Sequence, residues 1–149
     1  MITWQWSRLE ELTSTKSYRL FAARSTVFVI EQNCVYQDLD GLDLEALHLI
    51  GWSGNEVAAC LRVLAPGAKY VEASLGRVLT TAAFRGTGVG RDMLALGLQR
   101  IDRDYPSQPT RIGAQAHLQK FYGEFGFHAI SDIFIEDGIP HVEMLRLGS

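Results

Sequence analysis

The segment Phe84-Arg85-Gly86-Thr87-Gly88-Val89-Gly90-Arg91 connects a strand-like run at residues 73–80 to a helical pattern at residues 89–102. Glycine allows backbone conformations that are closed to other residues. Several N–H groups can therefore converge on one anion at the start of a helix, where the helix dipole also favours negative charge. Arg85 and Arg91 add two cations beside the glycines. The segment predicts a phosphate-binding turn.

Glycine-rich turns also occur in other kinds of site. A P-loop ends in Gly-Lys-Ser/Thr, whereas this turn ends in Gly90-Arg91-Asp92. The dinucleotide fingerprint spaces its glycines as G-x-G-x-x-G after the first strand of the domain, whereas here G-x-G-x-G follows several predicted strands. A tight turn without a ligand is a further alternative, but it leaves the two flanking arginines unexplained. A phosphate site of neither nucleotide-binding type is the interpretation we favour.

Periodic patterns on both sides of the turn predict the remaining elements. Alternating apolar and polar residues favour strands, spacing of three or four favours helices, and Gly54-Asn55 and Asp137-Gly138 suit tight hairpin turns. We expect strands at residues 4–9, 48–53, 56–64, 73–80, 111–116, 127–136 and 139–147, and helices at about 13–30, 89–102 and 118–125. Residues 31–46 are expected to form a loop. This order predicts an α/β (α+β) fold with a mixed sheet covered by helices.

Length and composition define the broad class. With 149 residues, 47% of them hydrophobic and 21% charged, residues 1–149 are expected to form a single globular domain. The apolar runs are far shorter than a membrane span and no signal-peptide pattern is found, so we expect a cytoplasmic protein without a membrane partner. A net charge of -3 argues against nucleic-acid binding. Cys34 and Cys60 are expected to be reduced thiols, and no metal site is predicted.

Several motifs along the chain match one known family. Arg85, Gly88 and Gly90 fit the signature R/Q-x-x-G-x-G/A of the GNAT superfamily of N-acetyltransferases, which this sequence resembles. Its ElaA-like branch is matched by four further motifs: Val27-Phe28-Val29-Ile30-Glu31-Gln32-Asn33-Cys34, Tyr36-Gln37-Asp38-Leu39-Asp40-Gly41, Gly113-Ala114-Gln115-Ala116-His117-Leu118-Gln119 and Glu136-Asp137-Gly138-Ile139-Pro140-His141. The resemblance implies a GNAT fold with a mostly antiparallel central sheet and helices on both faces. The strands that end at Thr80 and Ala116 would splay apart, and CoA would lie in the gap.

The resemblance also implies a donor site. The pantetheine arm of acetyl-CoA would pair with the main chain of Val78, Leu79 and Thr80 as an added strand does. The pyrophosphate would accept hydrogen bonds from the turn, that is, from the N–H groups of Arg85, Gly86, Thr87, Gly88, Val89 and Gly90, with Arg91 nearby. Gln115 stands where many relatives carry Asn, at a pantetheine contact.

Acyl transfer to an amine needs a polarised carbonyl, a deprotonated nucleophile and a proton for the departing thiolate. By the resemblance, a main-chain N–H near Leu79 would hydrogen-bond the thioester carbonyl, and the Tyr122 hydroxyl would protonate the CoA sulfur. Periodicity alone favours another role for Tyr122, because the adjacent Phe121 and Phe125 are typical of a packed core.

The base that removes the amine proton is less defined by the sequence. Glu31 and His117 are the leading candidates, with His48, Glu72 and His141 behind them. For each histidine, a hydrogen-bonded structural imidazole is an equally good interpretation. Glu31 closes an apolar helix, where a lone carboxylate is either solvated or part of a pocket.

The acceptor is predicted from a run of acidic residues. Between Arg24 and Arg62 there is no lysine or arginine, whereas six acids fall there, namely Glu31, Asp38, Asp40, Asp43, Glu45 and Glu56. Such a patch would attract a cationic amine, so Glu31, Asp38, Asp40 and His48 are the expected acceptor contacts. A solvated acidic loop explains the run equally well.

The residues and the resemblance together predict an acyl-CoA-dependent N-acyltransferase. It would move acetyl from acetyl-CoA directly to a primary amine of a small molecule or peptide in a ternary complex. The alternative is a non-catalytic acyl-CoA-binding sensor or regulatory subunit, and a purely structural protein is a third hypothesis. An acyl-carrying Cys34 is disfavoured, because no cation near it in the sequence would lower its pKa. Relatives of this family are often dimers, so a homodimer is compatible with the resemblance.

Overall fold

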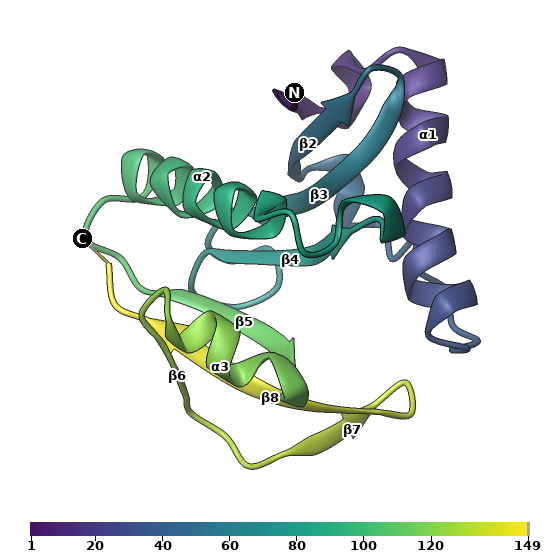
Figure 1. Ribbon diagram of the computed structural model, residues 1–149. Coiled ribbons are helices and arrows are strands. Elements are labelled where there is room, and N and C mark those ends of the chain that lie inside the picture. Colours follow the sequence, from purple (N-terminus) through teal and green to yellow (C-terminus); the bar gives the residue numbers. More distant parts are fainter. Residues whose placement is uncertain (149) are drawn as a thin grey trace.

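The computed structural model describes residues 1–148 and divides the strands between two sheets (Figure 1). The first sheet has the strand order β1 (Thr3–Arg8), β2 (Leu47–Ser53), β3 (Glu56–Leu64) and β4 (Ser74–Thr80). In the second sheet, β8 (Ile139–Arg146) pairs with β5 (Thr110–Gln115), β6 (Phe127–Ala129) and β7 (Phe134–Glu136). Each of these strand pairs is antiparallel.

Three α-helices accompany the sheets in the described part of the chain: α1 (Ser14–Arg24), α2 (Val89–Asp104) and α3 (Gln119–Gly123). The hydroxyl of Thr13 caps α1 by accepting a hydrogen bond from the N–H of Lys16, at 3.1 Å. This helix continues as a π-helical segment, Ser25–Glu31, and short 3₁₀ turns occupy Leu9–Glu11, Leu42–Leu44, Ala82–Phe84 and Ala116–Leu118. None of the helices within residues 1–148 is long and apolar enough to cross a membrane.

The first sheet is covered by helices on both faces, as the sequence predicted. Because side chains alternate along a strand, β2, β3 and β4 present two sets of apolar residues. One set, Leu49, Leu61 and Leu75, clusters with α2 residues such as Met93 and Leu98. The other set, Ile50, Cys60 and Leu79, clusters with Leu20, Val27 and Phe28 of α1 and the π-helical segment. The strands are therefore buried from both sides.

The two sheets meet at the beginning of β4 and β5. Within residues 1–148 their backbones join at a parallel bridge between Ala73 and Thr110, where the N–H of Arg111 donates to the carbonyl of Ala73 at 2.9 Å. Beyond the bridge, Leu79 and Thr80 pair with β3, while Ala114 and Gln115 pair with β8. The two strands thus start together and diverge. The predicted splay between the strands ending near Thr80 and Ala116 is confirmed.

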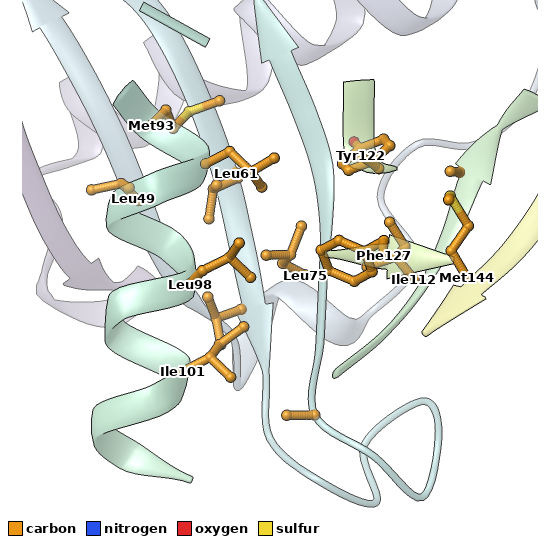
Figure 2. Packing of buried hydrophobic residues seen from close by; sticks show 14 of the residues in the cluster. Leu49, Leu61, Leu75, Met93, Leu98, Ile101, Ile112, Tyr122, Phe127 and Met144 are labelled. Atoms are coloured by element: carbon orange, nitrogen blue, oxygen red, sulfur yellow. The ribbon is translucent and has the colours of Figure 1, made fainter. Parts of the chain in front are cut away.

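One hydrophobic cluster extends beneath both sheets. In Figure 2, Leu75 of β4 lies between the α2 side chains and a second group formed by Ile112, Tyr122, Phe127 and Met144. Tyr122 makes edge-to-face contacts with Phe121 and Phe127, with ring centroids 5.3 and 5.9 Å apart. The two sheets are held together by this shared packing although their strands separate.

β4 contains a bulge opposite β3. Cys60 lies opposite Leu79, but Arg62 lies opposite Gly76, so β4 carries one residue more than β3 over this stretch. Arg77, inside the bulge, has a φ of 49°, a left-handed conformation that is unfavourable for a residue with a Cβ. A bulge redirects the backbone groups of the bulged strand. Here it redirects them next to the point where β4 leaves β5.

A buried network of ion pairs surrounds the bulge. Arg24 donates to Asp38 at 2.8 Å and to Asp43 at 2.6 Å, and Arg62 donates to Asp40 at 2.7 Å and to Asp43 at 3.1 Å. Both arginine side chains are almost fully buried. Burial raises the pKa of Asp43, but its hydrogen bonds and its proximity to the two guanidinium groups outweigh this effect and lower the pKa. The network connects α1 and β3 to the loop before β2.

The closing hairpin differs from its prediction in one strand. The Asp137-Gly138 turn is confirmed, with φ values of 50° and 76°. The predicted continuous strand 127–136 is instead two short strands, β6 and β7, which pair with opposite ends of β8. Residues 130–133 between them are not in a strand, although the N–H of Ile130 still donates to the carbonyl of Glu143 in β8 at 2.9 Å. The polar pair Ser131-Asp132 interrupts the apolar residues here, and the side chains of Ile130 and Ile133 on either side of it are exposed.

Replacing Asp43 with Ala should destabilise the fold strongly. Arg24 and Arg62 would keep their buried charges and lose a shared partner, and removing one partner of a buried pair costs about 3–5 kcal/mol. Urea denaturation of the variant measures this loss, with Asp132→Ala, an exposed aspartate between β6 and β7, as the matched control. A loss below about 1 kcal/mol for Asp43→Ala would show that the network is only a surface-like contact.

Candidate active site

A cleft of about 770 Å³ lies between β4 and β5. Its walls come from β4, the glycine turn after it, β5, α3, the π-helical segment and the tip of the β7–β8 hairpin. Both apolar and polar residues line these walls, which suits a long ligand with both characters. The cleft follows directly from the divergence of the two strands.

The glycine turn forms one end of the cleft. Gly88 is the N-cap of α2 with a φ of 87°, and Gly86 has a φ of 78°. A Cβ at either position would meet no atom within 4 Å, so the turn is open on its outer side. The Thr87 hydroxyl closes the turn by donating to the carbonyl of Phe84 at 2.5 Å. The first N–H groups of α2 have no partner one turn earlier in the helix, which makes this end suited to an anion.

The two arginines of the turn are present but each has an acidic partner. Arg85 forms an ion pair with Glu31 and donates through Nε to the carbonyl of Thr80 at 3.1 Å. Arg91 forms an ion pair with Glu124. All four charged groups are substantially exposed, so an incoming phosphate can exchange with either carboxylate.

The predicted donor-site residues lie around the cleft with two exceptions. Val78, Leu79 and Thr80 line it from β4, and Arg85, Gly86, Gly88, Gly90, Arg91 and Gln115 line it from the turn and from β5. Thr87 and Val89 are not among the lining residues. Thr87 closes the turn through its hydroxyl, and Val89, the first residue of α2, is buried in the core. Gln115 donates to the side-chain carbonyl of Gln32 across the cleft, at 3.3 Å.

Tyr122 lines the cleft from α3 while most of its ring is buried in the core. Burial raises the pKa of its hydroxyl well above the usual value, because the phenolate would lose its hydration. The group is therefore a neutral hydroxyl at physiological pH. The position of Tyr122 is compatible with a role in the core and with a role in the site. Its ring packs in the core, and its side chain also reaches the cleft.

The predicted bases occupy different surroundings. Glu31 lines the cleft, but its carboxylate is paired with Arg85 at the glycine turn. His117 lines the cleft as an exposed residue in the turn after β5. His48 is almost fully buried in β2, where its Nε2 lies 3.0 Å from the carbonyl of Asp43, and it does not line the cleft.

The predicted acidic patch is not a free surface. Asp38 is buried and pairs with Arg24, and Arg77 holds both Asp38 and Asp40 through contacts of 2.8 and 3.3 Å. Neither aspartate lines the cleft. The expectation that Asp38 and Asp40 attract a cationic acceptor was therefore wrong, as was the placement of His48 at the acceptor. These acids form ion pairs with arginines that are distant from them in the sequence.

Several cleft residues were not assigned to the site from the sequence. Cys34, Tyr36, Arg77, Glu136 and Asp137 line the cleft opposite the glycine turn. The thiol of Cys34 donates to the carbonyl of Asp137 at 3.0 Å and so links the loop before β2 to the hairpin tip. The motif Glu136-Asp137-Gly138 predicted a tight turn and supported the family resemblance, but neither of its acids was assigned to the site. Within residues 1–148, no group of three His, Cys, Asp or Glu side chains is arranged to hold a metal ion.

Two diverging parallel strands, a cleft between them and a glycine turn that leads into a helix define the class of acyl-CoA N-acyltransferases. The chain belongs to the GNAT acetyltransferase family: the family model for the acetyltransferase (GNAT) domain matches residues 15–147. The protein is accordingly an enzyme of the acyltransferase class.

Relatives are found among known sequences and known structures. Protein ElaA of Escherichia coli is 41% identical over 148 residues, which cover 98% of this chain and 97% of that protein. The crystal structure of an acyl-CoA N-acyltransferase from Pseudomonas aeruginosa has a TM-score of 0.92 at 38% identity, and that of Escherichia coli ElaA has a TM-score of 0.91 at 40% identity. Both structural matches cover 98% of this chain and 99% of the other. The resemblance to the ElaA-like branch is confirmed.

Gly88→Ala should weaken the binding of CoA about tenfold. An alanine in the left-handed conformation costs about 1–2 kcal/mol, which the turn would relieve by moving its N–H groups away from the anion. Isothermal titration calorimetry with CoA measures the change. Gly54→Ala is the matched control, because Gly54 is also left-handed, with a φ of 59°, but lies in the β2–β3 turn and not at the cleft. Equal dissociation constants of the two variants for CoA would show that the glycine turn does not bind CoA.

Proposed function

We propose that this protein transfers acetyl from acetyl-CoA to a primary amine by direct attack in a ternary complex. The observation that supports the proposal most strongly is the single cleft that runs from the glycine turn past the bulge of β4 to Tyr122. An anion site, an open strand edge and a neutral hydroxyl donor lie along it in an order that suits pyrophosphate, pantetheine and thioester sulfur.

The residues present fit acetyl-CoA as a substrate. In the proposal, the N–H groups of the glycine turn bind the pyrophosphate with Arg85 and Arg91 beside them. The pantetheine amides pair with the main chain of Val78, Leu79 and Thr80 along the edge of β4 that faces away from β3. When bound, acetyl-CoA supplies an activated acyl group whose carbon is open to attack by a nitrogen nucleophile.

The bulge of β4 is the proposed site of carbonyl polarisation. Its backbone groups are redirected between Gly76 and Leu79, and a main-chain N–H there would donate to the oxygen on which negative charge develops. Arg77 is fixed in this conformation by Asp38 and Asp40. A donor held rigidly before the reaction stabilises the transition state without the cost of reorganising at that moment.

Tyr122 is the proposed donor to the departing sulfur. Its raised pKa keeps the proton on the hydroxyl at physiological pH, so the group can donate a hydrogen bond to the thiolate as the C–S bond breaks. Transfer of the proton then accompanies bond cleavage and does not precede it. The partly apolar surroundings strengthen this hydrogen bond.

Release of CoA from acetyl-CoA across a panel of amines tests the proposal. The panel consists of spermidine, glucosamine and a lysine-containing peptide, and free thiol is the signal. Thiol release that depends on an amine supports acyl transfer. Thermal stabilisation by CoA without release by any amine would favour a non-catalytic acyl-CoA sensor, and no stabilisation by CoA would contradict both.

Tyr122→Phe should lower kcat by about 100-fold and leave the affinity for CoA unchanged, because the ring still packs and only the proton donor is lost. Steady-state kinetics and calorimetry with CoA measure the two quantities separately. Tyr18→Phe, on the exposed side of α1, removes the same hydroxyl from a position outside the cleft and serves as the control. An unchanged kcat for Tyr122→Phe would exclude the residue from the chemical step.

A further inference from the structure

The cleft is bordered by two faces of the second sheet. Val142 and Met144 of β8 are buried in the same cluster as Tyr122, opposite Ala114 and Ile112 of β5. Because neighbouring side chains on a strand point to opposite faces, His141, which pairs with Gln115, lies on the other face. Tyr122 and His141 both line the cleft and thus reach it from opposite sides.

The face that carries His141 has room for a second substrate. A recess of about 80 Å³ adjoins the cleft there, and the two share the lining residues Leu75, Gly76, Arg77, Gly113, Glu136 and His141. Gly76 has no side chain to fill the space between β4 and β5, and a Cβ built on it would meet no atom within 4 Å, whereas one built on Gly113 would meet the hydroxyl of Tyr70 at 3.3 Å. His141 therefore lies beside the bulge at which the thioester carbonyl is proposed to bind.

The imidazole of His141 is oriented by its own hairpin. Its Nδ1 lies 2.7 Å from the carbonyl of Ile139, and its ring stacks on Phe134 at a centroid distance of 6.1 Å. A carbonyl oxygen can only accept, so Nδ1 must carry a hydrogen. In the neutral ring the lone pair is then on Nε2. The hairpin thus selects the tautomer in which Nε2 can take a proton.

An acid accompanies this imidazole. Glu136 Oε2 lies 3.8 Å from Nε2 of His141 across the β7–β8 hairpin. Other charged groups around the same recess are Arg62 of β3, Lys69 of the preceding loop and Arg77 of β4. Arg62 and Arg77 are already neutralised by Asp38, Asp40 and Asp43. The Nζ of Lys69 lies over the ring of Tyr70, 5.4 Å from its centroid. Among the described residues that line the recess, Glu136 is the acid, and it is placed to hold an ammonium group next to Nε2.

The other candidate bases are less suitable. Glu31 is paired with Arg85 at the phosphate end of the cleft, and His117 is exposed. Neither the buried His48 nor Glu72 lines the cleft. We propose that His141 is the general base that deprotonates the acceptor amine, with Glu136 holding the acceptor's ammonium group. This inference rests on the proposed function. The acceptor is again a cationic primary amine, but it is bound at the β7–β8 hairpin and not at the acidic loop before β2.

Nε2 of His141 removes one proton from the ammonium, and the free amine attacks the thioester carbon to form a C–N bond. The C–S bond then breaks, its electron pair goes to sulfur, and the sulfur takes the proton of the Tyr122 hydroxyl. The second nitrogen proton returns to the Tyr122 oxygen through water. The imidazolium releases its proton to solvent, so the products are the amide, CoA and one proton.

His141→Asn tests the proposal, because the asparagine amide can still donate to the carbonyl of Ile139 but cannot accept a proton at neutral pH. With the panel amine that gives the highest wild-type rate, we expect kcat/KM for the amine to fall about 100-fold at pH 7 while CoA affinity is unchanged. The deficit should shrink towards pH 10, where an alkyl amine is deprotonated without help. His128→Asn, on the exposed face of β6, is the matched control.

Two outcomes would overturn the assignment. One is a wild-type rate and pH profile in a folded His141→Asn variant. The other is independent of activity: ¹⁵N spectra of histidine-labelled protein that show the neutral His141 ring with its hydrogen on Nε2 instead of Nδ1. If wild-type protein acetylates no amine while the spectra show the Nδ1–H form, the proposed function fails and the orientation of His141 stands.

Discussion

The bridge between Ala73 and Thr110 is the constraint on which the architecture of the cleft depends. It fixes β4 and β5 side by side at their beginnings, and the shared core under Leu75 holds the two sheets together while the strands diverge. Beyond this bridge, the inner edge of β4 has no strand partner among residues 1–148. An exposed strand edge is ordinarily a liability, but here it is a surface on which an extended ligand can form backbone hydrogen bonds.

The buried ion pairs matter more for the geometry of the β4 bulge than for the stability of the folded protein. Moving charges from water into the interior costs free energy that pairing only partly returns, so a network of this kind is weak evidence for a stabilising role. Its position is more informative, because Asp38 and Asp40 hold Arg77 in a left-handed conformation within the β4 bulge. The loop before β2 thereby fixes the direction of backbone groups that face the cleft.

Local features of the sequence predicted much of this structure. The glycine turn and the Gly54 and Asp137-Gly138 hairpins were predicted because the required backbone conformations depend on adjacent residues alone. Partners distant in the sequence were not predictable in this way. Asp38 appeared as a free acid because its arginine partners come from other elements, and the position of His141 beside the bulge follows from sheet pairing. The single domain and the cytoplasmic location remain predictions.

A crystal structure of the protein with CoA would show whether the cleft between β4 and β5 is the donor site. We predict that the pyrophosphate contacts the N–H groups of the turn at Gly86 to Gly90 and that the pantetheine arm pairs with the free edge of β4. The thiol should lie between Tyr122 and the bulge at Arg77. A pantetheine arm outside the gap between β4 and β5, or a pyrophosphate bound away from the N-terminus of α2, would contradict the account.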